Sequence, residues 1–515
     1  MTTRIPVLIC GGGIAGLTAA LLLHREGVQS MVVERHPTTS PQPKARRFNS
    51  RSTEVFRLLG LEQEVAKASA PLAAFTGMLT GPTLAEATWP EISEGARAHA
   101  AQHEKLRELS PAPSVLCPQD ALEPVLRHAA EERGVLVRFS TELVSFTQDS
   151  TGVIATLRQT TGDSYEVTAD YLIGADGARS PVRTALGVLR SGHGHLADNL
   201  DLCFRADLTE LVRDKPFNLC QITNPVASGA FVSVNGTDRW LFSTSDFAGS
   251  DTLDAVAWRE LLRTVVGVPD LEVELLSRMH WESAMHVADR YRAGRVLLAG
   301  DAAHVMPPLA AAGANTAVGD VANLAWKLAA VLGGTADPAL LDTYHAERYP
   351  VGYATAEFSS MISGHLGTMV ASVTSDDGPR FDPSTTLFGL QYDEGAFVPD
   401  GREPAPVDHY APAGRPGTRI PHAWLGPTTS PLDLAGPGLV LLAGPACTEW
   451  TAQAERLGIK HRTIADPHWL SETGLPADGA LLLRPDAIVA WHSRADVSLA
   501  EAMGRVLCTT APAPV

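Results

Sequence analysis

The chain of 515 residues is longer than one ordinary hydrophobic core requires, so we expect roughly two or three domains. Its 41 Lys and Arg against 58 Asp and Glu give a formal charge of −17, which disfavours nucleic acid and anionic membranes as partners. No apolar run is long enough to cross a bilayer, no export signal stands at the N-terminus, and the six cysteines form no CxxC pair or Cys/His cluster. We therefore expect a cytoplasmic enzyme without a metal centre.

A glycine-rich turn opens the chain. Residues 7–33 predict a strand, a helix and a second strand, and the turn after the first strand carries Gly11, Gly13 and Gly16 in the order G-x-G-x-x-G. Glu34 ends the second strand. Such glycines bring a helix N-terminus to a pyrophosphate, and an acid at this distance accepts hydrogen bonds from a ribose. The pattern predicts a dinucleotide site; the alternative is a tight structural turn.

A basic cluster follows this unit. It contains Lys44, Arg46, Arg47 and Arg51 and comes after a loop rich in Pro, Ser and Thr. In a net acidic protein, basic residues just beyond a nucleotide fingerprint indicate neutralisation of phosphate charge. The alternative is a solvated loop, which is what most charge runs are.

Two later apolar segments also end in an acid. Residues 171–174 are followed by Asp176, and residues 295–299 are followed by Asp301. Ligands of open α/β sheets bind at the carboxyl ends of the strands, so both acids are candidates for cofactor binding. Taken alone, an Asp-Gly pair is usually only a turn.

A proline pair and a small-residue turn follow the third acid. Pro307 and Pro308 precede residues 310–315, and a helix is predicted over 316–331. The positively polarised N-terminus of such a helix suits an anionic oxygen of a cofactor ring. We expect His304 to be a structural histidine, with proton transfer as the alternative.

The rest of the chain predicts further helices and strands. Residues 119–133 form an amphipathic helix, and residues 374–419, rich in Pro, Gly and Asp, form a linker. Short β-rich segments separated by turns predict an antiparallel sheet between 191 and 287, with one helix at 258–266. The predicted strands are 135–139, 153–157, 165–168, 202–206, 217–222, 229–235 and 239–244, and in the C-terminal region 439–442, 480–483 and 488–491, with helices at 449–457 and 499–507.

The fingerprint and the two later strand ends, taken together with the proline pair, form an ordered signature. It resembles the FAD-dependent aromatic hydroxylases of the p-hydroxybenzoate hydroxylase type, which are single-component flavoprotein monooxygenases. The subset that acts on aromatic polyketides and phenolic natural products is most similar. Two segments of this chain resemble the thioredoxin-like C-terminal domain of that subset. They are Arg415-Pro416-Gly417 with Pro421-His422, and Arg484-Pro485-Asp486 before Trp491.

This resemblance implies a fold and its domains. We expect an α/β FAD-binding, Rossmann-like domain of the glutathione-reductase type at 1–190 and 288–373. An inserted antiparallel β-sheet domain for substrate occupies 191–287 with part of 70–113. Residues 374–419 are a linker, and residues 420–515 are the thioredoxin-like α/β domain.

The resemblance also implies roles for individual residues. The ADP half of FAD is held by the fingerprint and Glu34, Gln119 contacts the ribityl chain, and Asp301 binds the ribityl or ribose hydroxyls. Asp176 and Gly177 serve both FAD and the nicotinamide cofactor. The full cofactor-binding set is Gly11, Gly13, Ile14, Ala15, Gly16, Glu34, Arg35, Lys44, Gln119, Leu143, Asp176, Gly177, Gly300, Asp301, Pro308, Gly313, Ala314 and Asn315.

Two positions depart from the family pattern. Lys44 stands where the family often has an arginine near the pyrophosphate and NADPH, so a point charge replaces a bidentate donor. Ala310 replaces a common glycine after the proline pair, which restricts the backbone there. These departures leave NADPH and NADH both open as the reductant.

The implied activity is hydroxylation of a phenolic, polycyclic substrate. NADPH or NADH reduces FAD, and O2 then gives a flavin C4a-hydroperoxide that oxygenates the ring. The substrate is expected between the β-rich region and the flavin, near Pro307 and Pro308. Gln221, Asn224 and His286 are its polar candidates, and no catalytic base is assigned. Alternatives are a Baeyer-Villiger or other oxidative rearrangement, a redox-silent flavin module and a nicotinamide dehydrogenase; the protein is expected to be a monomer or homodimer.

Overall fold

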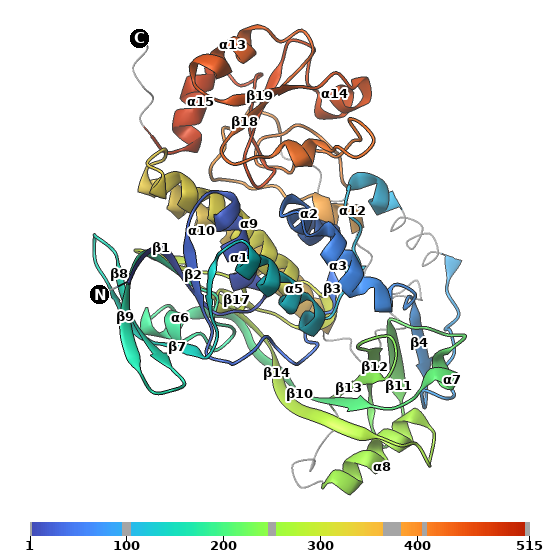
Figure 1. The fold of residues 1–515 in the computed structure, drawn as a ribbon. Coiled ribbons are helices and arrows are strands. Elements are labelled where there is room, and N and C mark those ends of the chain that lie inside the picture. The colour runs from blue at the N-terminus through green and yellow to red at the C-terminus, as the bar shows by residue number, and fades with distance from the viewer. Residues whose placement is uncertain (1–2, 95–104, 246–253, 364–382, 404–408, 510–515) are drawn as a thin grey trace.

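The computed structural model describes residues 3–94, 105–245, 254–363, 383–403 and 409–509. Figure 1 shows a central sheet packed against helices, a second sheet below it, and the C-terminal part above it. The long strands β10 (Arg190–Arg205) and β14 (Glu274–Ala288) run from the centre of the molecule into the lower sheet.

The central sheet has eight strands around a parallel core in the order β16, β9, β1, β2, β6. Its inner strands consist almost wholly of buried apolar residues, as expected where neighbouring elements cover them. The predicted strands at 165–168 and 171–174 form one strand, β9. The core strands are β1 (Thr3–Cys10), β2 (Ser30–Val33), β6 (Leu136–Arg138), β9 (Ser164–Gly174) and β16 (Val296–Leu298), with β15 (Arg292–Ala293), β7 (Thr141–Gln148) and β8 (Val153–Gln159) at the edges.

The parallel register brings four strand ends together. Cys10 at the end of β1 lies beside Val33 of β2 and Gly174 of β9, and Leu298 of β16 lies beside the same Gly174. The residues that follow β1, β2, β9 and β16 therefore meet at one edge of the sheet, as the sequence predicts. This edge is the candidate site.

Helices pack on the central sheet and carry the site's remaining residues. The helix α1 follows the fingerprint turn and packs against α5 and α9, and α10 packs on α9. Among the described residues, no helix is both long enough and apolar enough to span a membrane. The helices are α1 (Ile14–Arg25), α2 (Ser50–Leu58), α3 (Glu62–Ser69), α5 (Gln119–Glu132), α6 (Pro181–Ala185), α9 (Gly313–Leu332) and α10 (Asp342–Ser363).

The second sheet has seven strands in the order β17-β14-β10-β13-β12-β11-β4. The prediction located β11, β12 and β13 but missed β4, β14, β17 and most of β10. In β10, glycines and an irregular register interrupt the polar–apolar alternation. The remaining elements are β4 (Met78–Gly81), α7 (Thr209–Val212), β11 (Leu219–Thr223), β12 (Ser228–Ser233), β13 (Arg239–Thr244), α8 (Ala255–Val266) and β17 (His304–Val305).

The C-terminal part contains a four-stranded sheet in the order β19-β18-β20-β21. The predicted strands and helices are present within one residue at each end, whereas β19 and α14 were not predicted because their sequences are largely polar. The elements are α12 (Pro383–Phe388), β18 (Val440–Ala443), α13 (Glu449–Arg456), β19 (Lys460–Thr463), α14 (Pro467–Thr473), β20 (Ala480–Leu483), β21 (Val489–His492) and α15 (Leu499–Val506).

The predicted linker carries packed side chains where it is described. Tyr392, Ala396, Val398 and Arg419 are all buried. Residues 374–382 and 404–408 of that prediction lie outside the described residues. The described parts of 374–419 thus join the C-terminal sheet to the helices of the central sheet.

Candidate active site

The three fingerprint positions carry glycine for different reasons. A Cβ on Gly11, whose φ is +113°, would lie 2.1 Å from the Ala175 carbonyl oxygen, and a Cβ on Gly16 would lie 1.9 Å from the Gly11 carbonyl oxygen. The fold itself requires these two glycines. The nearest described atom to a Cβ on Gly13 would be Oε1 of Glu123, at 3.4 Å. The fold therefore does not itself require a glycine at Gly13, and the bare backbone there fits the approach of a ligand such as a pyrophosphate.

Glu34 lies half-buried where β2 ends. Its carboxylate accepts hydrogen bonds from the backbone N–H groups of Gly12, at 2.8 Å, and His36, at 2.9 Å. A carboxylate has about four lone-pair positions, so the two oxygens retain acceptor capacity for ribose hydroxyls.

Two other predicted cofactor residues lie near Glu34. Strand β7 begins beside it, because the Thr141 N–H donates to the Glu34 carbonyl at 2.8 Å, and Leu143 follows, half-buried. Arg35 is exposed, and its Nε lies 3.2 Å from Nε2 of His36.

Asp301 lies at the edge where β16 ends. Its side chain is open to solvent on one side, yet the surrounding protein desolvates it enough to raise its pKa, against the opposing charges of His304 and Lys44. Gly300 before it would place a Cβ 3.2 Å from that of Ala15 on α1. Asp301 is therefore an exposed acid beside the fingerprint helix, with Lys44 near enough to act on its charge.

Gln119 is joined to an acid that the sequence analysis missed. Its Oε1 accepts from the Ala45 N–H at 3.2 Å, and its Nε2 donates to Oε1 of Glu123 at 2.6 Å. Oε2 of Glu123 accepts from the Ser40 N–H at 2.8 Å. Burial raises the pKa of Glu123, which lies next to Gly13. The sequence did not single out Glu123, because it lies within an ordinary amphipathic helix.

Asp176 caps a short helix. Its Oδ1 accepts from the Ser180 hydroxyl at 2.6 Å, and its Oδ2 accepts from the Val182 N–H at 2.9 Å at the start of α6. Burial nonetheless raises the pKa of Asp176. Gly177 has a φ of +82°, which favours glycine at this turn.

The N-terminus of α9 presents backbone donors. Gly313, Ala314 and Asn315 form its first turn, and the N-cap residue Ala312 supplies no side-chain hydrogen bond. The amides of a first turn have no acceptor within their own helix. They fit an anionic or carbonyl oxygen of a ligand ring.

The Asn315 side chain holds this helix end in place. Its Oδ1 accepts from the Asn49 N–H at 2.9 Å and from the Ser52 hydroxyl at 2.6 Å. Its Nδ2 donates to the carbonyl oxygens of Arg47, at 3.0 Å, and Ala311, at 2.6 Å. All these contacts are within the protein, so only the backbone of Asn315 is left for a ligand.

Two arginines of the basic cluster have partners within the protein. Arg46 donates to the carbonyl oxygens of Asn218, at 3.2 Å, and Ser233, at 2.7 Å, and so ties the loop to the second sheet. Arg51 pairs with Glu54 on α2. Of the cluster, Lys44 and Arg47 are exposed, so phosphate neutralisation, predicted for the whole cluster, fits these two.

His304 belongs to a buried ion-pair network. Its Nε2 lies 2.6 Å from Oδ2 of Asp320, and Nε of Arg348 donates to Oδ1 of Asp320 at 2.9 Å. All three side chains are buried. Burial would raise the pKa of Asp320, but the charges of His304 and Arg348 lower it. This network favours the structural role expected for His304.

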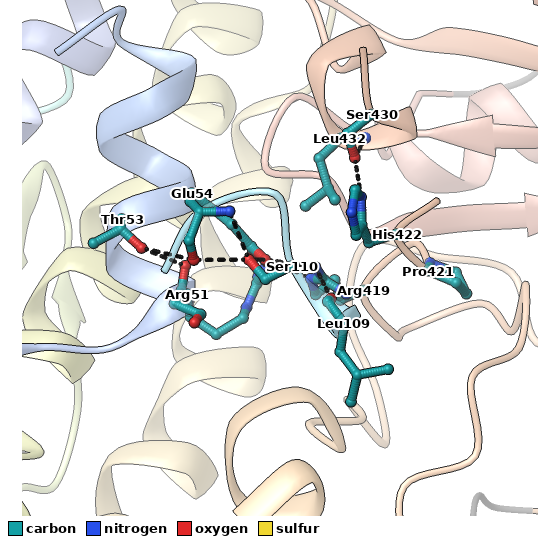
Figure 2. Close-up of polar contacts among 12 residues, drawn as sticks. Arg51, Thr53, Glu54, Leu109, Ser110, Arg419, Pro421, His422, Ser430 and Leu432 are labelled. Carbon is teal, nitrogen blue, oxygen red and sulfur yellow. Dashed lines mark hydrogen bonds and ion pairs between the residues drawn. The ribbon is translucent and has the colours of Figure 1, made fainter. Parts of the chain in front are cut away.

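A second buried acid joins α2 to the C-terminal part. Glu54 accepts from Arg419 and from the Ser110 hydroxyl, the latter at 2.7 Å, and it also pairs with Arg51 (Figure 2). Burial would raise the pKa of Glu54, but the charges of Arg419 and Arg51 lower it.

Glu347 on α10 is the third buried acid that pairs with basic side chains. Its carboxylate lies 2.8 Å from the guanidinium nitrogens of Arg484 and 2.9 Å from Nζ of Lys327. The pKa of Glu347 is well below its ordinary value, because the charges of Arg484 and Lys327 outweigh the effect of burial. Burial lowers the pKa of Lys327 to about 8.

The predicted substrate-side residues are not all brought together. Pro307 is buried and Pro308 exposed after β17, which pairs with β14 next to His286. Gln221 lies on β11, and Asn224 accepts from the Val226 N–H at 2.8 Å in the turn that follows. His286 faces Arg190 and Arg183, whose charges, with burial, lower its pKa. Gln221 and His286 are thus at opposite ends of the sheet.

A cavity of about 480 Å³ lies between α1, α9, α10 and the C-terminal part. Its lining includes Ala312 and Asn315 at the start of α9, together with Trp326 and Asp486. None of its described lining residues belongs to the fingerprint or to the second sheet. The cavity thus adjoins the N-terminus of α9 from the C-terminal side.

The fold and site define a class of protein. A glycine fingerprint with an accessible backbone at Gly13, acceptors at Glu34 and Asp301 and free amides on α9 fit FAD, whose pyrophosphate, ribose, ribityl and ring oxygens need these groups. The second sheet leads to this site through β17, which is followed by Pro307 and Pro308. The class is that of the flavoprotein hydroxylases.

Family models agree with this class. Residues 4–359 match the FAD binding domain, and residues 413–510 match the C-terminal domain of aromatic-ring hydroxylases. The chain belongs to the FAD-binding-domain family of aromatic hydroxylases.

Similar proteins cover nearly the whole chain. The tetracenomycin A2 monooxygenase-dioxygenase of Streptomyces glaucescens is 38% identical, over 100% of this chain and 98% of the relative. Aklavinone 12-hydroxylase RdmE of Streptomyces purpurascens is 37% identical, with 97% of each covered.

Solved structures have the same fold. The flavin-dependent monooxygenase PieE in complex with FAD and substrate has a TM-score of 0.87 at 33% identity, covering 98% of this chain and 99% of that chain. The ternary complex of aklavinone-11 hydroxylase with FAD and aklavinone has a TM-score of 0.85 at 33% identity, covering 99% and 100%.

Proposed function

We propose that the protein is a FAD-dependent monooxygenase that hydroxylates an aromatic, phenolic and polycyclic substrate. NADPH or NADH serves as the reductant and O2 as the co-substrate. The observation that carries the proposal is the meeting of the fingerprint, Glu34, Asp301 and the α9 amides at one sheet edge that faces a second sheet. Similar proteins named as putative polyketide hydroxylases support the substrate class.

We assign the cofactor contacts as follows. The amides at Gly13 and the following residues of α1 receive the pyrophosphate, with the charge of Lys44 nearby. Glu34 accepts from the ribose of the adenosine, and Asp301 accepts from ribityl hydroxyls. The first turn of α9 donates to the pyrimidine edge of the ring. When bound, FAD supplies the oxygen-activating redox chemistry.

The protein's own part is binding and exclusion of water. The proline pair and the inner face of the second sheet surround the aromatic ring, and the flavin-facing end of α9 is fixed by the Asn315 side chain. When the protein holds the substrate ring and the flavin in place, little further freedom is lost during the reaction. This favours transfer of oxygen to one ring position. We assign residues 420–515 a structural role and place the protein in the cytoplasm.

Oxygen uptake and NADPH oxidation test this function. The FAD-loaded protein is mixed with NADPH or NADH, with and without naphthols, hydroxyanthraquinones and simple phenols. We expect one class of phenol to accelerate flavin reduction sharply and to yield a product heavier by one oxygen atom. A ring-inserted lactone from a polycyclic ketone would move the reaction to the Baeyer-Villiger type. Slow reduction with every compound and no oxygen uptake would contradict an oxygenase.

A further inference from the structure

The second sheet has two unlike faces along β10. Leu200, Leu202 and Phe204 point into the apolar cluster that contains Trp258 of α8. Because successive residues of a strand point to opposite sides, Asp201 lies on the other face. A small separate apolar cluster, with Cys203 among its members, marks that face.

The face that carries Asp201 is called the inner face. The FAD-binding part covers it toward one end. Nε2 of Gln42 donates to the Ser277 hydroxyl at 2.9 Å, and Arg239 pairs with Asp120 of α5 at 2.9 Å. Ser277 lies directly beside Cys203. Cys203 follows Asp201 by two residues on β10, so both are on the same face. The loop before α2 and the start of α5 thus close the face just beyond Asp201.

The other end of the face leads to the proline pair. Val287 of β14 pairs with His304 of β17, and the chain continues from β17 to Pro307 and Pro308. Met285 and Val287 on the inner side of β14 belong to the core of the central sheet. Asp201 therefore lies between two elements that border the proposed flavin site.

Asp201 is the ionisable member of a row that crosses the sheet. Residues directly opposite each other on neighbouring strands share a face. This places Met279 of β14, Ser243 of β13, Ala230 of β12 and Gln221 of β11 in line with Asp201. The predicted candidate Gln221 is thus part of this row, but it cannot take up a proton as a carboxylate can.

The Asp201 carboxylate has an unsatisfied oxygen. Among the described residues, its Oδ1 is buried without a hydrogen-bond partner, and so is Nε1 of Trp281. Burial raises the pKa of Asp201, while Ser243 and Trp281 lie close enough to lower it in part. Neither contact has the geometry of a full hydrogen bond at Oδ1, so this oxygen and the Trp281 N–H retain capacity for a bound polar group.

We propose that Asp201 is the general base that accepts the hydroxyl proton of a phenolic substrate, with the Trp281 indole N–H donating to the same substrate oxygen. The phenol O–H bond breaks, an O–H bond forms on the carboxylate, and the electron pair stays on the phenolate oxygen. The ring then attacks as a better nucleophile. The substrate is a phenol that binds un-ionised. This inference rests on the proposed hydroxylase function.

The test compares Asp201→Asn with wild type, both loaded with FAD. Asp198→Asn is the matched control, because Asp198 lies on the same strand but its side chain is exposed. The probe is the phenol with the highest turnover in the panel, together with its methyl ether, which has no proton to give. The measurements are FAD content, the absorbance of the bound phenol, and the rate of product formation between about pH 6 and pH 10, which reaches the ordinary pKa of a phenol near 10.

We expect Asp201→Asn to keep FAD, to bind the phenol without a phenolate band, and to form product about 10²–10⁴-fold more slowly at neutral pH. The rate should recover toward high pH, where the phenol ionises in solution. Asp198→Asn should behave as wild type, and the methyl ether should react equally slowly in both enzymes. An Asp201→Asn enzyme with a wild-type phenolate band and pH profile would overturn the inference.

A second variant keeps the test decisive if Asp201→Asn does not fold. Trp281→Phe removes a donor that lowers the pKa of Asp201. The acid limb of the wild-type rate profile should then move to higher pH, and an unmoved limb would contradict the inference. If wild type itself oxygenates no phenol, the proposed function fails; if wild type is active and both variants match it, only the base assignment fails.

Discussion

Acids that the protein desolvates differ between the candidate active site and the C-terminal junction. At the candidate active site and on the second sheet, Asp176, Asp201 and Asp301 have raised pKa values. At the junction, Glu54 and Glu347 have lowered pKa values because arginines pair with them. Desolvation acts on both groups, and only the junction acids have counterions that outweigh it.

The difference separates ligand binding from stability. An acid whose desolvation is not outweighed by a counterion is a candidate for ligand binding. Breaking a buried ion pair is costly, because removing one partner leaves the other charge buried. The acids of the candidate active site and the second sheet should therefore affect cofactor and substrate, and the junction acids should affect the free energy of unfolding.

The largest effect is expected at Gly16. In Gly16→Ala the new Cβ would lie 1.9 Å from the Gly11 carbonyl oxygen, so we expect the protein not to fold. Gly13→Ala is the matched variant, since its Cβ meets Glu123 at 3.4 Å. It should fold with a normal circular dichroism spectrum and bind FAD weakly. Equal FAD binding by Gly13→Ala and wild type would argue against a pyrophosphate at this turn.

The next largest effect is expected at the junction. Arg484→Met removes a buried partner of Glu347 and should lower the free energy of unfolding by about 3–5 kcal/mol in urea denaturation. FAD affinity of the folded fraction should stay near that of wild type. A variant as stable as wild type would show that this ion pair does not hold the C-terminal part.

Asp301→Asn should separate FAD affinity from the stability of the fold. FAD should bind roughly tenfold or more weakly, because a charge-assisted acceptor contributes about 1.5–3 kcal/mol. The apo protein should be about as stable as wild type, since Asp301 is exposed there. Fluorescence titration with FAD and thermal melting of the apo form measure both. A yellow, fully loaded variant would contradict the assignment.

The pH dependence of stability should follow the three buried acids that pair with arginines. The pKa values of Glu54, Asp320 and Glu347 are lowered in the folded protein, so the unfolded chain binds more protons as the pH falls. Their contribution is complete above the ordinary carboxyl pKa of about 4 and is lost below it. Urea unfolding of apo protein from pH 7 to pH 3 should show this loss, and Arg484→Met should show less of it. Identical profiles would contradict the role of Glu347.

The smallest effect is expected at an exposed pair. Arg505 and Glu501 on α15 form an ion pair with both side chains about half exposed. Arg505→Met should change the free energy of unfolding by no more than about 0.5 kcal/mol. A loss comparable to that of Arg484→Met would mean that burial does not distinguish the two pairs.

The sequence predicted those parts of the site that depend on local order. The fingerprint, Glu34, Asp176 and Asp301 each follow an apolar strand, and parallel pairing then places them together. The role of Asp201 was not predictable, because it depends on which strands neighbour β10 and on which elements cover the inner face. Glu54 and Arg419 are 365 positions apart, and no local pattern relates them. Arg46 was predicted at phosphate, but its carbonyl partners come from a sheet far along the chain.

Isotope incorporation tests the central claim most directly. The FAD-loaded protein, reduced by NADPH, is mixed with ¹⁸O2 and the accelerating phenol, and the product mass is measured. The account predicts a hydroxylated phenol that carries one ¹⁸O atom. Hydrogen peroxide with an unchanged phenol, or a product with oxygen from water, would contradict it.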